Sequence, residues 1–146
     1  MKTTRLLALA ATLVLGALPA RGQLPASNPF AAPSTLPFQA PPFDRIKVTD
    51  YQPAIEEGMK IQRAEMEAIA NNPAPPTFAN TIEAMEKTGV LLTRAYKVFY
   101  NIEQSDTNEA IQKIKSEVAP KLSAHSDAIN LNPKLYARIK AIYAQR

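Results

Sequence analysis

The feature that most constrains the fold is a run of apolar residues at helical spacing between Thr77 and Gln104. The large apolar side chains recur every three or four residues, with Gly89 in the one gap at the same phase. They are Phe78, Ile82, Met85, Leu92, Tyr96 and Phe99. This spacing puts them on one face of a helix. Four more apolar residues widen the face in the second half: Leu91, Ala95, Val98 and Ile102. We therefore predict one long helix that neighbours cover on more than one side, as in a bundle.

A second helix is predicted before this stretch, from Asp50 to about Ala70. Asp50 is a suitable N-cap, and Pro53 then falls in the first turn, where its missing N–H is tolerated. The inward stripe of this helix is Ile55, Met59, Met66 and Ile69. The proline-rich run 71–76 ends it, and Thr77 caps the long helix that follows.

Two helices are predicted after the long one. Residues 106–108 open the first, and Pro120 inside it is expected to kink it or split it in two. Its buried face is Ile111, Ile114, Val118, Leu122 and Ile129. Asn132-Pro133 opens the last helix, whose inward residues are Leu135, Ile139 and Ile142. The fold class is therefore all-α, a bundle of about four helices over residues 49–146.

The segment 23–48 differs from the helical region because prolines recur in it every four residues from Pro25 to Pro41. Proline excludes a regular helix here and favours extended or polyproline-like backbone. Its apolar residues are Phe30, Leu36, Phe38 and Phe43. We expect an extended Pro-rich arm pinned at these residues along the outside of the helices; a disordered segment is the alternative.

Residues 1–22 have the layout of a secretory signal peptide. Lys2 and Arg5 precede an apolar run that is too short to span a bilayer, and small residues follow it. Cleavage is expected between Gly22 and Gln23, giving a secreted or periplasmic protein with no membrane attachment; an N-terminal membrane anchor is the alternative. Without this segment the chain has 14 basic and 13 acidic residues. That balance does not favour a nucleic-acid partner.

No group of residues in the sequence has the pattern of a catalytic site. Cysteine is absent, which excludes thiolate chemistry. His125 is the one histidine, on the apolar stripe of the third helix, and no carboxylate stands three or four residues away. We expect a buried or half-buried histidine that is bonded locally rather than a metal ligand. Catalytic and metal-binding residues are therefore predicted to be absent, and substrate-binding residues are unknown.

The acidic residues are predicted to form surface ion pairs with basic residues four positions along each helix. The expected pairs are Glu56 with Lys60, Glu83 with Lys87, Glu109 with Lys113, and Glu117 with Lys121. Pairs of this kind contribute only about 0.2–0.5 kcal/mol each. The tyrosine pairs Tyr96/Tyr100 and Tyr136/Tyr143 are interpreted as packing residues, in the core or at an interface.

Several segments, taken in order, resemble a known family. They are Asn28-Pro29-Phe30, the run 34–44 (STLPFQAPPFD), the run 75–86 (PPTFANTIEAME), and 119–129 (APKLSAHSDAI) followed by Leu131-Asn132-Pro133. Together they are similar to the N-terminal region of bacterial peptidyl-dipeptidases (dipeptidyl carboxypeptidases), in the thimet-oligopeptidase family of zinc metallopeptidases. No single segment is diagnostic, but their order is fairly specific and covers nearly all of residues 28–146.

The resemblance implies that this chain is the N-terminal portion of a larger all-helical peptidase that releases dipeptides from the C-terminus of short peptides. In that family an H-E-x-x-H helix and a downstream glutamate hold the catalytic zinc. This sequence contains no H-E-x-x-H motif, so zinc belongs to the inferred full-length enzyme and none is expected on this fragment. The fragment should be inactive and should expose apolar surface that the missing C-terminal part normally covers. The alternative is a non-catalytic secreted helical binding module.

Overall fold

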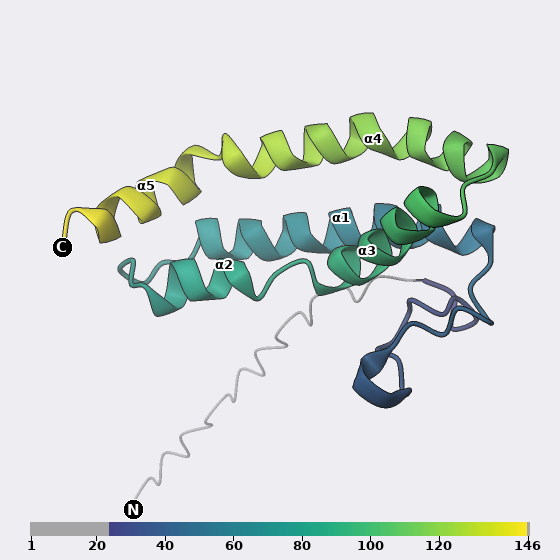
Figure 1. Cartoon of the computed structure of the whole chain (residues 1–146). Helices are drawn as coiled ribbons and strands as arrows, with labels where there is room; N and C mark the ends of the chain where they lie inside the picture. The colour runs from purple at the N-terminus through teal and green to yellow at the C-terminus, as the bar shows by residue number, and fades with distance from the viewer. Residues whose placement is uncertain (1–23, 146) are drawn as a thin grey trace, which may run out of the picture.

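The structure is a computed structural model that describes residues 24–145. The predicted signal peptide and its cleavage site at Gly22 and Gln23 lie outside the described residues, so they stay predictions. Residues 24–145 form helices and turns without any strand (Figure 1). The all-α prediction is confirmed.

Four helices of three turns or more make up the body of the protein. They are α1 (Val48–Ala70), α3 (Val90–Ser105), α4 (Glu109–Asn130) and α5 (Pro133–Tyr143). Three short elements complete the described part of the chain: the 3-10 turn η1 (Pro37–Gln39), the π-helical turn η2 (Ala79–Glu83) and the short helix α2 (Ala84–Glu86).

Helix α1 begins earlier than predicted, at Val48 rather than after Asp50. Asp50 occupies the third helical position, where its Oδ2 accepts a hydrogen bond of 2.8 Å from the backbone N–H of Lys47. An acid in the first turn still satisfies a free donor and faces the positive end of the helix dipole. The predicted cap was therefore placed three residues too late. Pro53 lies in the second turn rather than the first, and α1 nevertheless continues to Ala70 as expected.

The predicted single helix over 77–104 is wrong, because the chain breaks at Gly89. Gly89 has φ +70°, a left-handed conformation that ends α2 and immediately precedes α3. The Thr88 hydroxyl donates to the Met85 carbonyl at 2.8 Å, and the Gly89 N–H donates to Glu65 Oε2 at 2.8 Å. The apolar spacing runs straight through this break, because Gly89 stands in phase with the stripe. Phase alone could not reveal the break.

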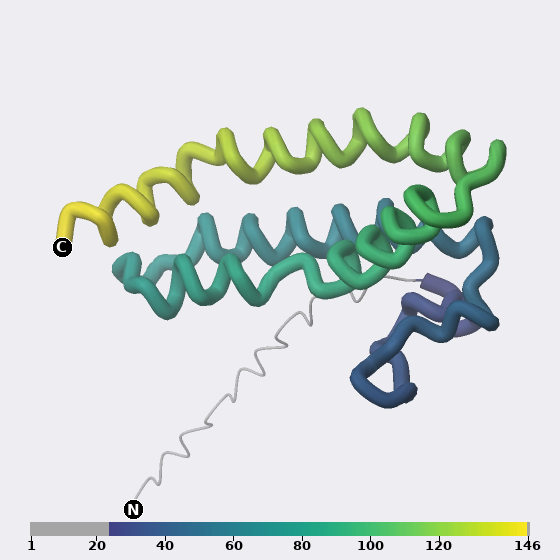
Figure 2. The backbone as a smooth tube through the Cα atoms, viewed as in Figure 1, coloured from purple at the N-terminus to yellow at the C-terminus, as the bar shows by residue number. Residues whose placement is uncertain are grey.

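Helix α4 lies parallel to α1, and α3 runs in the opposite direction along the first half of α1 (Figures 1 and 2). The parallel register shows in the contacts: Lys121 with Glu56, His125 with Gln62, and Lys134 with Asn71 join residues 65, 63 and 63 positions apart. A nearly constant separation is what parallel helices of equal rise per residue produce. The long helices α1 and α4, with 23 and 22 residues, set the length of the bundle.

The main core lies where α1, α3 and the first half of α4 meet. Its fully enclosed members include Ile55, Ala95 and Ile111, each 0% exposed. Gly58 lets α1 and α3 approach closely, since a Cβ atom added there would lie 2.6 Å from the Cα of Leu92. A smaller cluster around Met66, Ala70 and Leu135 holds α5 against the far end of α1.

The segment before α1 is a succession of turns rather than the extended arm that was predicted. Backbone hydrogen bonds close turns between Asn28 and Pro25, Gln39 and Leu36, and Arg45 and Pro42. Pro37 is the second residue of the turn 36–39, and Pro29 is the second residue of a further turn closed between Ala31 and Asn28. Proline at that position favours such closure as readily as extended backbone.

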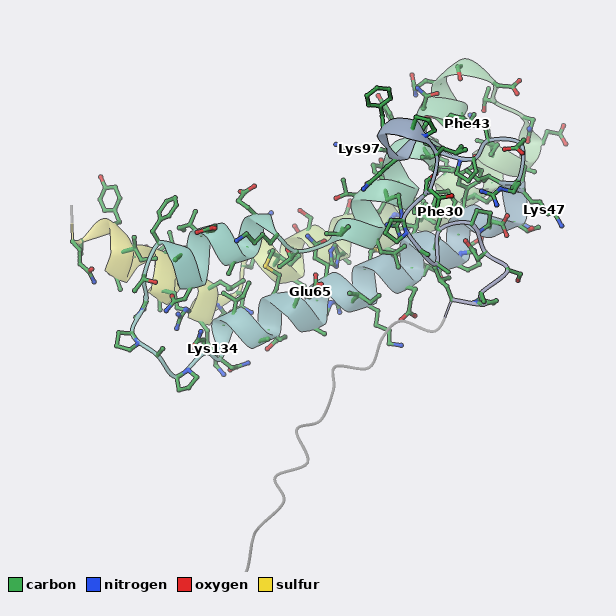
Figure 3. All side chains as sticks on the ribbon, turned by 90° about the horizontal axis from the view of Figure 1, so that it is seen from below. Phe30, Phe43, Lys47, Glu65, Lys97 and Lys134 are labelled. Carbon is green, nitrogen blue, oxygen red and sulfur yellow. The ribbon has the colours of Figure 1, made fainter. Side chains whose placement is uncertain are left out.

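Phe30 is the most buried apolar anchor of this segment on the helices, and Leu24 and Ile46 also pack against the main core. Phe30 is 2% exposed and packs on Tyr51 with ring centroids 5.7 Å apart. Its carbonyl accepts a 2.6 Å hydrogen bond from Arg94 Nη2, and Asn28 Nδ2 donates to the Asp50 carbonyl at 3.1 Å. Three other apolar side chains that were expected to pin the arm are exposed instead: Leu36, Phe38 and Phe43. Figure 3 shows Phe30 among the helices and Phe43 further out.

The last two helices begin where the sequence signals predicted. Pro120 does not split α4, which is one helix from Glu109 to Asn130, so the prediction of a split is wrong. Helix α5 starts at Pro133 as expected. The Asn132 side chain accepts from the N–H groups of Lys134 and Leu135 at 2.9 and 3.2 Å, which confirms the predicted cap. Among residues 24–145 no helix has the length and apolar character needed to cross a membrane.

Candidate functional site

Residues 24–145 contain no cluster of three or more histidine, aspartate or glutamate side chains that could hold a metal ion. The side chains with functional potential are instead a buried histidine, two buried charged residues and a set of exposed aromatics. Each lies on a helix whose apolar spacing explains its position.

His125 is buried, with 4% of its surface exposed, on the face of α4 that contacts α1. Its Nε2 lies 2.8 Å from Oε1 of Gln62. Burial first, and the positive charge of Arg63 second, lower the pKa of this imidazole below its usual value. The prediction of a buried histidine is confirmed, but its partner is on another helix and not local in sequence. His125 therefore joins α4 to α1 as a neutral side chain near neutral pH.

The surface ion pairs follow the predicted pattern only in part. Lys87 Nζ lies 2.7 Å from Glu83 Oε1, as predicted. Glu56 does not pair with Lys60; it pairs with Lys121 across the α1–α4 seam, and this takes Lys121 away from Glu117. Lys60 pairs weakly with Glu57 at 3.4 Å instead. Glu109 and Lys113, which the structure also describes, form no ion pair. Spacing along one helix cannot anticipate a partner on a neighbouring helix.

Glu103 is a buried acid that sequence reasoning missed. It is 7% exposed on α3, and its carboxylate accepts from Lys115 Nζ at 2.7 Å, from Gln112 Nε2 at 3.4 Å and from Gln104. The hydrogen bonds from Lys115 and Gln104 hold the pKa of this carboxyl below its usual value. The hydrogen bond between Lys115 and Glu103 also raises the pKa of Lys115. Glu103 follows Phe99 by four residues on the apolar stripe. An acidic residue at a position of the apolar stripe was the sequence signal that could have predicted its burial.

A groove of about 320 Å³ between α3 and α4 is lined in part by Glu103. Its apolar lining includes Phe99, Val118 and Leu122, together with the exposed Tyr96 and Tyr100. The two tyrosine rings lie 6.3 Å apart. The carboxylate of Glu103 is already neutralised by its lysine, so the groove offers packing surface but no free catalytic group.

Arg138 is the second buried charge that sequence reasoning missed. It is 6% exposed on α5 and donates to the carbonyls of Asn72 and Ala74 at 2.8 and 3.2 Å. It also donates to Thr81 Oγ1 at 3.2 Å and to Asn80 Oδ1 at 2.9 Å. All four acceptors are neutral, so the guanidinium holds the loop and η2 through geometry and not through an ion pair. The run 75–86, one of the segments that carry the family resemblance, owes part of its position to Arg138.

Large apolar side chains remain exposed on the half of the bundle around η2 and α5. Exposed fractions are 65% for Phe78, 78% for Leu131, 64% for Tyr136 and 37% for Ile139. Tyr136 and Ile139 are three residues apart on α5, so they share one side of that helix. The prediction that Ile139 faces inward is therefore wrong, because the buried side of α5 is formed by Leu135 and Arg138. An exposed apolar surface of this kind is typical of a region that contacts other protein.

Two curated proteins are similar to this chain, and no known protein-family model matches it. The dipeptidyl carboxypeptidase of Salmonella typhimurium is 44% identical over 120 residues, and that of Escherichia coli is 44% identical over 119 residues. Each alignment covers 82% of this chain and 18% of the relative, so the chain spans under a fifth of the length of either relative. The chain is thus homologous to the N-terminal part of bacterial dipeptidyl carboxypeptidase.

Proposed function

We infer that this chain forms the N-terminal wall of a zinc peptidase that removes dipeptides from the C-terminus of short peptides. The observation that carries this inference is the 44% identity to two proteins named dipeptidyl carboxypeptidase, over 82% of the chain. Its all-helical architecture agrees with the resemblance in the sequence. Its role is to shape access to a catalytic centre that other parts of the longer protein supply.

The residues of this chain do not fit a catalytic zinc site. The one histidine is buried, and its Nε2 is engaged with Gln62. Glu103 and Glu56 are each paired with a lysine, and residues 24–145 bring no metal-ligating group together. The zinc that peptide hydrolysis would use in the longer protein therefore has its ligands elsewhere. We likewise propose that the short peptides are substrates of the longer protein and not of this chain alone.

The exposed apolar side chains on η2, α4 and α5 supply a second part of the proposal. Phe78, Leu131 and Tyr136 are each more than 60% exposed, and in the longer protein they would lie against the remaining part of the chain. A secreted or periplasmic location rests on the composition of residues 1–22 alone, and fractionation of the source cells would test it.

The direct test is to read the DNA downstream of the Arg146 codon. A frame that continues to an H-E-x-x-H helix supports the peptidase wall. A stop codon at that point overturns it for this product and leaves the binding module, whose exposed apolar face would then seat a separate partner.

A second test assays the purified 146-residue chain with fluorogenic short peptides and zinc. We expect no zinc-dependent turnover and no stoichiometric zinc in equilibrium dialysis. Zinc-dependent cleavage by the pure chain would contradict the assignment of the catalytic groups to another part of the protein.

A further inference from the structure

A chain of three polar side chains crosses the bundle at the break between α2 and α3: the buried His125 and the half-buried Gln62 and Thr88. His125 Nε2 lies 2.8 Å from Gln62 Oε1, and Gln62 Nε2 lies 3.3 Å from Thr88 Oγ1. The Thr88 hydroxyl lies 2.8 Å from the Met85 carbonyl. Three elements therefore meet through one amide side chain: α4, α1 and the break before Gly89.

The direction of donation along this chain is fixed at one end. A carbonyl oxygen can only accept, so the Thr88 hydroxyl donates to Met85. Its oxygen then accepts from Gln62 Nε2, which turns the Gln62 carbonyl oxygen toward His125. The imidazole must donate through Nε2, and its Nδ1 is the bare nitrogen of the neutral tautomer.

The Nδ1 atom of His125 is buried and has no hydrogen-bond partner. A proton added there would create a buried donor without an acceptor, on a side chain that is 96% enclosed. The charged group that acts on the ring from α1 is Arg63, which has the same sign as an imidazolium. Protonation at Nδ1 is therefore unfavourable in the packed bundle and favourable once the ring reaches water.

Four other charged side chains on the surrounding elements have partners of their own. Glu65 on α1 accepts from the Gly89 N–H at 2.8 Å. Lys87, beside the break, pairs with Glu83, and Lys121 on α4 pairs with Glu56. On α5, Arg138 donates to neutral oxygens of the loop and η2.

We propose that His125, Gln62 and Thr88 form an acid-released latch, in which protonation of His125 at Nδ1 undocks the second half of α4 from α1 and frees the break at Gly89. Closed, the latch holds three elements through one amide. The open latch leaves the main core intact, because Ile55 lies in the first half of α1 and Ile111 in the first turn of α4.

The sign of the pH dependence follows from linkage. The folded pKa of His125 lies below its ordinary value of 6.5, so the open state binds the extra proton first as the pH falls. Above about pH 6.5 the protonation of His125 does not add to opening; below that the opening constant rises by up to about tenfold per pH unit, until the folded pKa is reached.

The test uses the 146-residue chain, whose single histidine makes its NMR titration unambiguous. We expect the ring to titrate below pH 6.5. We also expect amide exchange in residues 121–130 and 87–90, corrected for intrinsic rates, to accelerate up to tenfold per unit between pH 6.5 and the measured pKa. Amides around residue 111 should keep their protection over the same range.

The matched variant is His125→Gln, whose amide nitrogen can replace Nε2 as donor to Gln62 but does not titrate in this range. It should abolish the extra acceleration at acid pH. Glu109→Gln, at an exposed acid in the first turn of α4 far from the latch, is the control that should retain it. The same acceleration in His125→Gln as in the parent chain would overturn the latch. If that variant does not fold, the parent chain still decides: a histidine pKa at or above 6.5, or uniform exchange along α4, would overturn it.

Discussion

The close approach of α1 and α3 at Gly58 makes the strongest quantitative prediction. In Gly58→Ala the new Cβ would lie 2.6 Å from Leu92 Cα and 2.7 Å from its backbone nitrogen. Ordinary contact begins near 3.4 Å, so the two helix backbones must separate by about 1 Å. Backbone atoms cannot rotate out of the way as the end of a side chain can. The seam that opens includes Ile55 and Ala95, both 0% exposed.

Two opposing contributions set the size of the effect. Overpacking of a tight core costs about 1–3 kcal/mol, and the upper end applies because the obstacle is backbone. Alanine gains about 1 kcal/mol over glycine inside a helix. We therefore expect Gly58→Ala to lower the free energy of unfolding by about 2 kcal/mol, which is a fall of roughly 8 °C in Tm for a domain of this size.

Urea unfolding followed by circular dichroism measures this change, with the midpoint shifted and the slope unchanged. Ala68→Gly on the exposed side of α1 is the matched control, and it should lose only about 1 kcal/mol through helix propensity. An increase in stability for Gly58→Ala would refute the reasoning, because it would mean that propensity outweighs the contact.

Three further predictions concern the buried side chains. Phe30→Ala should lower the free energy of unfolding by about 3 kcal/mol, the lower end for a buried phenylalanine, while Phe38→Ala should change the urea midpoint little because Phe38 is fully exposed. Arg138→Met should lower it by about 2–3 kcal/mol, because the buried Thr81 hydroxyl and two part-buried backbone carbonyls lose their donor. Hydrogen exchange should speed up at residues 80–83, and unchanged exchange there would contradict the role of Arg138 in holding η2. Glu103→Gln should flatten the pH dependence of stability in acid: the folded pKa of Glu103 lies below its ordinary 4.5, so its contribution is present above pH 4.5 and is lost as the pH falls through the folded value. A urea midpoint that falls as steeply in Glu103→Gln as in the parent chain between pH 5 and 3 would show that another group is responsible.

The helices could be predicted from the sequence because their signals are local. Asn132 followed by Pro133 gives a start that depends on two residues only, and the structure places α5 there. The break at Gly89 could not be read in the same way. Its left-handed backbone is stabilised by the Glu65 carboxylate, which lies 24 residues away in the sequence. Helical phase continues across such a break, so periodicity predicts which residues face the core but not whether the backbone is continuous.

The candidate site was predictable only as far as single helices reveal it. His125 was correctly expected to be buried, because it stands between apolar residues at helical spacing. Its bond to Gln62 was not foreseen, since the partner is 63 residues away. Glu103 and Arg138 stand in phase with apolar stripes, but a charged residue in that phase is buried only if another element brings partners. Those partners come from α4 for the acid and from η2 and its preceding loop for the arginine.

The parallel register of α1 with α4 and α5 determines where this chain can change length. Contacts at Glu56, Gln62 and Asn71 all pair with residues 63 to 65 positions later. One residue inserted within α1 would turn everything after it by about 100° and break each later pair at once. The turn 106–108 lies between the helices and is exposed, so a residue added there changes no rotation inside α1 or α4. Insertions and deletions among homologues should therefore gather at 106–108 and avoid the two long helices.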